Sequence, residues 1–251
     1  MPNWNPWHGC TKISEGCRHC YVYRQDARYG VEIHSSVVRK NKTSFDLPLR
    51  RKRDKTYKLV SGQTIFTCFT SDFFIKEADE WRIEAWSMIK LRHDLNFMIF
   101  TKRIDRFLAC LPDDWGDGYE NVIVSCSVEN QAMADYRLPI LLKSPIRHKA
   151  IIVAPMLEKM DISAYLTNDI EQVAVGGESG INARICDYAW ILDIRRQCIE
   201  KKVSFHFHQT GSRFLKDGKL YMIRRSEQES QAKKASINHM TIDNGNTRHA
   251  L

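Results

Sequence analysis

Apolar runs alternate with amphipathic segments along most of this chain. Short runs rich in β-branched and aromatic residues predict strands at residues 64–70, 96–100, 121–126, 149–154, 171–175 and 203–208. Apolar positions at helical spacing predict helices at residues 21–30, 75–93, 131–142 and 183–201, with shorter helices near 105–110 and after Asp161. The first of these helices is expected to end at Gly30.

Strands that alternate with helices are typical of a parallel sheet. With a short first strand before Cys10, the pattern gives six or seven βα units, so we expect a TIM-type (βα) barrel, full or partial. An open doubly wound sheet is the alternative, although no glycine-rich dinucleotide fingerprint follows any predicted strand. We expect one domain over residues 1–225. Residues 226–251 have little apolar content and no periodicity, which predicts a polar, flexible tail.

Polar motifs follow the predicted strands directly. In a (βα) barrel the carboxyl ends of the strands form one face, and active sites are built there. Six polar strand ends therefore predict a pocket. The motifs are Thr70-Ser71-Asp72, Thr101-Lys102-Arg103, Ser125-Cys126-Ser127-Val128-Glu129-Asn130, Pro155-Met156-Leu157-Glu158, Gly176-Gly177-Glu178-Ser179-Gly180 and His208-Gln209-Thr210-Gly211.

The last predicted strand alternates between apolar and polar side chains. Phe205 and Phe207 should face the helix layer, which turns His206 and His208 toward the barrel interior. His206 reads as a core histidine bonded to a neighbour. His208 lies nearer the end of the strand and is the better functional candidate.

The composition is that of a globular protein, with 43% hydrophobic and 27% charged residues. No window approaches the roughly 18 uninterrupted apolar residues of a membrane helix. The start of the chain lacks the basic and apolar regions of a secretory signal. We therefore expect a cytoplasmic protein that does not enter a membrane.

The formal net charge of +8 is concentrated in residues 39–58, which we interpret as a basic insertion. Nine basic residues stand there against Asp46 and Asp54, a local excess of seven charges. A run such as Arg50-Arg51-Lys52-Arg53 is either a solvated loop or a segment that follows phosphates. Nucleic acid is the partner that this segment would favour.

Three of the eight cysteines lie close together near the start of the chain, spaced C-x6-C-x2-C at Cys10, Cys17 and Cys20. Thiolates in a tight turn can converge on one metal centre. Three of them can hold a [4Fe–4S] cluster and leave one iron open to a ligand from outside the protein.

Other interpretations of the cysteines stay open. Zinc could bind the three thiolates with His8 or His19 as a closed Cys₃His site, or the thiols could be buried without a metal. The five remaining cysteines are widely separated and read as small core residues. Of these, Cys68 or Cys126 could supply a fourth ligand.

The Trp4–Tyr21 stretch and the strand-end motifs together resemble a phage-associated family of three-cysteine proteins of unknown function, which itself looks like the radical S-adenosylmethionine (SAM) superfamily. The resemblance runs from Trp4 to about Gly211. Three departures stand out. The superfamily usually separates its first two cysteines by three residues rather than six. The family generally has glutamate at the position of Ala154 and lysine at the position of His208.

The resemblance implies a [4Fe–4S] cluster on Cys10, Cys17 and Cys20, and SAM bound to the open iron. It also implies an electron donor. Lys102 or Arg103 would pair with the SAM carboxylate. Gly176 and Gly177 would let the backbone approach a ligand closely. Acceptors for the SAM ammonium and ribose would come from Ser71, Asp72, Ser125, Ser127 and Glu129, and candidate catalytic groups would be Glu178 and His208.

Two functions follow as hypotheses. The first is a radical SAM-type enzyme that cleaves SAM reductively and acts on an unknown substrate, with nucleic acid or a nucleotide favoured by the basic segment. The second is a non-catalytic nucleic-acid-binding protein that zinc or a cluster stabilises.

Overall fold

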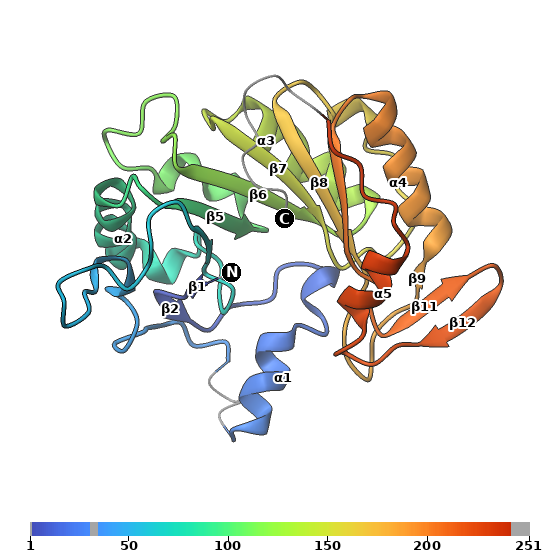
Figure 1. Cartoon of the computed structure of the whole chain (residues 1–251), viewed down its shortest axis with the longest axis horizontal. Helices are drawn as coiled ribbons and strands as arrows, with labels where there is room; N and C mark the ends of the chain where they lie inside the picture. Colours follow the sequence, from blue (N-terminus) through green and yellow to red (C-terminus); the bar gives the residue numbers. More distant parts are fainter. Residues whose placement is uncertain (1, 31–34, 242–251) are drawn as a thin grey trace. The chain divides into compact units, whose positions relative to one another are not determined.

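The computed structural model describes residues 2–30 and 35–241. The chain divides into two compact units. The first contains Met1–Ile13, Val22–Ser125 and Lys143–His148, and the second contains Ser14–Tyr21, Cys126–Leu142 and Lys149–Leu251. The boundary between Ser125 and Cys126 falls within strand β6 (Val122–Val128), which Figure 1 labels.

The main sheet of the described part has seven strands in the order β1-β4-β5-β6-β7-β8-β10. The pairs β1–β4, β4–β5, β7–β8 and β8–β10 are parallel. The six strands predicted from the apolar runs are present within a few residues of the expected bounds. Besides β6, the strands are β1 (Asn3–Trp4), β4 (Thr64–Thr67), β5 (Asn96–Thr101), β7 (His148–Val153), β8 (Ile170–Gly176) and β10 (Ser204–Gln209).

The expectation of a TIM-type barrel, full or partial, is wrong. The order of the sheet begins at β1 and ends at β10, so these strands are edges rather than neighbours. The part of the chain that the structure describes also has too few helices for regular βα units. Near the two places where we expected short helices, the connections contain only short 3-10 helices, Ile104–Arg106 and Leu108–Cys110 between β5 and β6 and Ser163–Tyr165 between β7 and β8.

The outer edge of β10 gives the physical reason why no barrel closes. Phe205 and His239 exchange two backbone hydrogen bonds, of 2.7 and 2.9 Å, in an antiparallel bridge. The backbone N–H of Phe207 donates to Asn238 Oδ1 at 2.8 Å. Because the end of the chain uses these groups, β10 cannot accept a further parallel strand along this edge.

The end of the chain carries helix α5 (Gln228–Lys234), where the sequence predicted no element. Its first residue, Gln228, is fully buried. The Gln228 amide donates to Ser212 Oγ at 2.9 Å, and its carbonyl oxygen accepts from Ser179 Oγ at 2.7 Å. Residues 228–241 are therefore packed as part of the second unit, while residues 242–251 of the expected tail lie outside the described residues.

The first unit has an aromatic core beside helix α2 (Asp79–Leu91). Trp86 of this helix packs against Phe73 and Trp115, with ring centroids 4.9 and 5.1 Å apart. The two N-terminal tryptophans are fully buried, and their indole N–H groups donate to Phe45 O from Trp4 and to Asp72 O from Trp7. The unit also contains helix α1 (Tyr21–Arg28) and the short paired strands β2 (Trp7–His8) and β3 (Arg39–Lys40).

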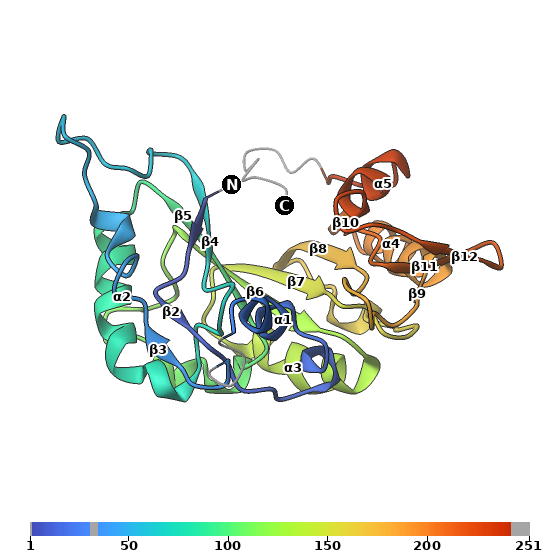
Figure 2. The ribbon, with the colours of Figure 1, turned by 90° about the horizontal axis from the view of Figure 1, so that it is seen from below.

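The second unit contains helices α3 (Gln131–Lys143) and α4 (Tyr188–Glu200) and a small sheet (Figure 2). Helix α4 begins later than residue 183 because Asp187 caps it, accepting a hydrogen bond from Ala189 N at 2.9 Å. Helices α4 and α5 both pack on β10. The small sheet consists of β9 (Cys186–Asp187), β11 (Arg213–Lys216) and β12 (Lys219–Met222).

Candidate functional site

The turn that carries Cys10 depends on Gly9. Gly9 has a φ of +93°, and a Cβ placed on it would lie 2.2 Å from the carbonyl oxygen of Val37. Only glycine tolerates both conditions. Backbone hydrogen bonds from Gly9 N to Thr70 O and from Cys10 N to Ser35 O then hold the turn in place.

Arg103 lies against this turn with its guanidinium almost fully buried. Its Nη1 is 3.5 Å from Cys10 Sγ and 3.4 Å from Asp72 Oδ2. Its Nη2 donates to the carbonyl and the hydroxyl of Thr11 at 2.7 and 2.8 Å. Arg103 therefore holds the cysteine turn and places a positive charge beside the Cys10 sulfur.

Asp72 joins the ends of β4 and β5. Its Oδ1 accepts from Thr101 Oγ1 at 2.8 Å, and its Oδ2 accepts from Lys102 N at 2.9 Å. Ser71 Oγ donates to the carbonyl of Gly9 at 2.5 Å. Ser71 and Asp72 are thus engaged in supporting the turn.

The ammonium of Lys102 forms no ion pair within the described residues.

The second and third cysteines belong to the second unit. The backbone N–H of Cys17 donates to Ser14 O at 2.9 Å, and that of Cys20 donates to Cys17 O at 3.3 Å. Gly16 N donates to Glu129 Oε1 at 3.2 Å, and a Cβ on Gly16 would lie 2.9 Å from the carboxyl carbon of Glu129. This loop is therefore fitted closely to Glu129.

Glu129 forms a buried ion pair with Arg137 on α3. Arg137 Nη1 lies 2.8 Å from Glu129 Oε2 and also donates to Ser127 O at 2.8 Å. Neither side chain is more than 2% exposed. The carboxylate of Glu129 thus fixes both the helix and the loop of Cys17.

Ser125, in the first unit, has a fully buried hydroxyl with no hydrogen-bond partner in the described part of the chain.

Glu178 is held by Arg184 and His19. Arg184 Nη2 donates to Glu178 Oε1 at 2.7 Å, Arg184 Nε donates to Oε2 at 3.0 Å, and His19 Nδ1 lies 3.2 Å from Oε2. Burial alone would raise the pKa of Glu178, but the hydrogen bonds from Arg184 and His19 outweigh it and lower this pKa. Glu178 is therefore an ionised carboxylate that ties the loop of His19 to the end of β8.

His208 occupies the space beside Gly176. A Cβ on Gly176 would lie 2.2 Å from His208 Nε2, and one on Gly177 would lie 2.3 Å from Thr210 O. The two glycines thus let β10 approach β8, and their role toward a ligand stays a prediction. Burial, together with the nearby charges of His206 and Arg225, lowers the pKa of His208 from 6.5 to about 4.

The low pKa of His208 predicts a loss of stability in mild acid. The unfolded chain takes up a proton as the pH falls below 6.5, whereas the folded chain resists it until about pH 4. Stability should therefore fall by about 1–3 kcal/mol across this window and be constant above it. Urea denaturation at several pH values tests this. The fall in the free energy of unfolding between pH 6.5 and pH 4 should be smaller in a His208→Gln variant. It should be unchanged in the control His93→Gln, because His93 is exposed. An equal fall in the parent and both variants would contradict the prediction.

The two units divide the predicted site residues. The boundary between Ile13 and Ser14 falls inside the cysteine motif. No group of three or more His, Cys, Asp or Glu side chains in the described ranges is arranged to hold a metal ion. The first unit contains Cys10, Ser71, Asp72, Lys102, Arg103 and Ser125, and the second contains Cys17, Cys20, Ser127, Glu129, Gly176, Gly177, Glu178 and His208.

Exposure separates the cysteine motif from the other cysteines. Cys10, Cys17 and Cys20 are partly exposed and form no disulfide, whereas the other five are buried. Burial, with the nearby Asp72 and Cys10, raises the pKa of Cys68 well above its ordinary value, so Cys68 is a poor thiolate ligand. Sequence reasoning did not predict the ion pairs that Arg137 and Arg184 form with the carboxylates of Glu129 and Glu178. Each follows its carboxylate partner by six to eight residues, but many charge pairs in the sequence share such spacing.

No helix in the described ranges combines the length and the apolar character needed to cross a membrane.

The structure thus defines an α/β protein with an open sheet and three accessible cysteines near its start. A family model described as "Protein of unknown function (DUF5131)" matches residues 2–244, and the chain belongs to this family. The expectation of a family of unknown function is confirmed. Comparisons with curated proteins and with solved structures found no match.

Proposed function

We propose that the protein is a radical SAM-type iron–sulfur protein in which Cys10, Cys17 and Cys20 hold a [4Fe–4S] cluster. The exposure of the cysteines carries the proposal, because only these three of the eight are accessible to solvent. A cluster needs thiolate ligands that a metal can reach, and the buried cysteines do not qualify. The similarity to the superfamily and the phage association of the resembling proteins are part of this proposal.

The surroundings of Cys10 fit the charge of such a cluster. Arg103 places its guanidinium 3.5 Å from Cys10 Sγ. A cluster bound by thiolates carries negative charge, which a nearby buried cation compensates. The contacts of Arg103 with Cys10, Thr11 and Asp72 therefore support it as a residue that positions Cys10.

Two side chains fit the expected SAM contacts in the first unit. Lys102 follows the end of β5 and forms no ion pair in the described chain, so its ammonium is the better partner for the SAM carboxylate. Ser125 has a buried hydroxyl that lacks a partner there. A buried hydroxyl without a partner is costly, and a polar ligand would satisfy it. When bound, the cluster and SAM would together supply hydrogen abstraction from a substrate.

Anaerobic reconstitution tests the proposed metal. We expect a brown protein with about four irons and a similar amount of sulfide per chain. Stoichiometric zinc with no iron after reconstitution would contradict the proposal. That outcome would favour the second candidate, a zinc-stabilised nucleic-acid-binding protein.

The second candidate has one structural feature in its favour. Residues Arg51, Lys52, Arg53 and Lys55 are exposed together in a short turn of the basic segment. Arg51 stacks on Tyr57, and Asp54 accepts hydrogen bonds from Thr56, so the turn is ordered by its own contacts. An ordered group of exposed cations is suited to phosphate backbones.

A further inference from the structure

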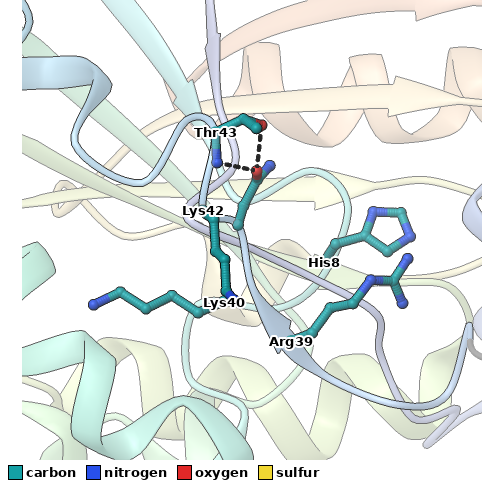
Figure 3. A pocket seen from close by; sticks show the side chains of 6 residues that line it. His8, Arg39, Lys40, Lys42 and Thr43 are labelled. Atoms are coloured by element: carbon teal, nitrogen blue, oxygen red, sulfur yellow. Dashed lines mark hydrogen bonds between the residues drawn. The ribbon is translucent and has the colours of Figure 1, made fainter.

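A pocket of about 290 Å³ opens in the first unit beside the paired strands β2 and β3 (Figure 3). Among the residues that the structure describes, its lining contains no acidic side chain. The lining residues are His8, Arg39, Lys40, Asn41, Lys42 and Thr43.

The wall of the pocket is firmly held. His8 pairs with Arg39 in the antiparallel register of β2 and β3, so their side chains lie next to each other (Figure 3). The neighbouring Trp7 is fully buried. The backbone N–H of Asn41 donates to Pro6 O at 2.9 Å and continues the pairing beyond β3.

A buried carboxylate orients His8. The Nε2 atom of His8 lies 2.9 and 3.0 Å from the two carboxylate oxygens of Asp26. Asp26 is buried and also accepts a hydrogen bond from Ser35 Oγ at 2.8 Å. The second ring nitrogen of His8, Nδ1, makes no hydrogen bond within the described residues. Asp26 therefore fixes the imidazole and leaves one nitrogen for a ligand.

The remaining polar groups of the pocket are chiefly donors. Asn41 Oδ1 accepts from both the N–H and the hydroxyl of Thr43, and the Asn41 Nδ2 donors have no partner among the described residues. Lys42 is exposed and forms no ion pair in the described part of the chain. Lys40 differs, because its ammonium pairs with Glu84 and lies over the ring of Phe45.

We propose that this pocket binds a phosphate group through Arg39, Lys42 and the amide of Asn41. The guanidinium, ammonium and amide donors that line this one pocket match the several oxygens of a phosphate better than the two of a carboxylate. The volume exceeds what one phosphate fills, so part of an attached nucleoside would fit as well. The source is inorganic phosphate, a mononucleotide or a nucleic-acid strand. The proposal goes beyond the cluster function and does not depend on it.

Binding of three probes to the full chain tests the site. The probes are a fluorescently labelled single-stranded oligonucleotide, measured by anisotropy, and AMP and inorganic phosphate as competitors. The Arg39→Gln/Lys42→Gln variant should bind the best probe at least about tenfold more weakly. The matched control Lys201→Gln/Arg224→Gln removes the same two charges from exposed positions outside the basic segment and should change the affinity less than about threefold.

A third variant, Asn41→Asp, replaces the amide donors of Asn41 with a negatively charged acceptor and keeps every lysine and arginine. The new carboxylate can still accept the hydrogen bonds from Thr43. This variant should weaken binding as strongly as the double variant. Equal losses in the pocket variant and its control would overturn the pocket and leave a general effect of the protein's positive charge. Absence of binding of all three probes to the parent protein at low salt would overturn it too. Protein with and without the cluster should give the same result.

Discussion

Replacing Cys17 with alanine is expected to leave the reconstituted protein without its cluster, with iron falling from about four per chain to near zero. The proposed cluster has only three protein ligands, so the loss of one leaves two thiolates. The fold should tolerate the change, because Cys17 is partly exposed and its backbone N–H still donates to Ser14 O.

Iron and sulfide determination after anaerobic reconstitution measures this effect. The matched control is Cys110→Ala, which removes a buried thiol outside the motif and should keep the full iron content. Circular dichroism establishes that both variants are folded. Retention of four irons by Cys17→Ala would remove Cys17 from the ligand set.

Replacing Arg137 with methionine is expected to lower the free energy of unfolding by about 3–5 kcal/mol. Methionine keeps most of the side-chain volume, but the change leaves the carboxylate of Glu129 buried without its cation. A lone buried charge is far more costly than a missing surface pair. Urea denaturation at neutral pH measures the effect.

Two further variants separate charge from packing. The double variant Glu129→Gln/Arg137→Met has no unpaired charge and should recover most of the lost stability. The exposed Arg196 on α4 pairs with Asp193 and Glu200, and Arg196→Met should cost less than about 1 kcal/mol. A loss below about 1 kcal/mol in Arg137→Met would mean that the buried pair does not stabilise the second unit.

The strands could be predicted because each of them is a short run of mostly apolar residues that can be recognised without knowing its partners. Every residue of β6, from Val122 to Val128, is buried, and such a continuous run of mostly apolar residues has few other interpretations. The closure of the sheet could not be predicted in this way. Closure depends on which segment pairs with the outer edge of β10, and the pairing residue, His239, lies in a polar stretch without periodicity.

The hairpin of β11 and β12 was missed although a signal for it exists. Asp217 and Gly218 have φ angles of +50° and +73°, as a two-residue hairpin turn requires. An Asp-Gly pair between alternating apolar positions is a known sign of such a turn.

The residue types of the candidate site stay a prediction from the sequence, and their contacts could not be predicted. Ser71, Asp72 and Arg103 were identified because they follow strands. Their partners are Gly9, Thr101 and Thr11, up to 92 residues away in the chain. Because those contacts occupy the side chains, Asp72 and Arg103 support the cysteine turn, and Lys102 is left as the available cation.

The bridge between Phe205 and His239 also bears on self-association. A strand at the edge of a sheet exposes backbone donors and acceptors that can pair with the same strand of another molecule. The backbone groups of Phe205 and Phe207 are occupied within the chain by His239 and Asn238. The polar residues at the end of the second unit therefore protect strand β10 from pairing with other molecules. In a chain that ended before Gln228, the backbone groups of Phe205 and Phe207 would be unpaired, and we would expect it to aggregate.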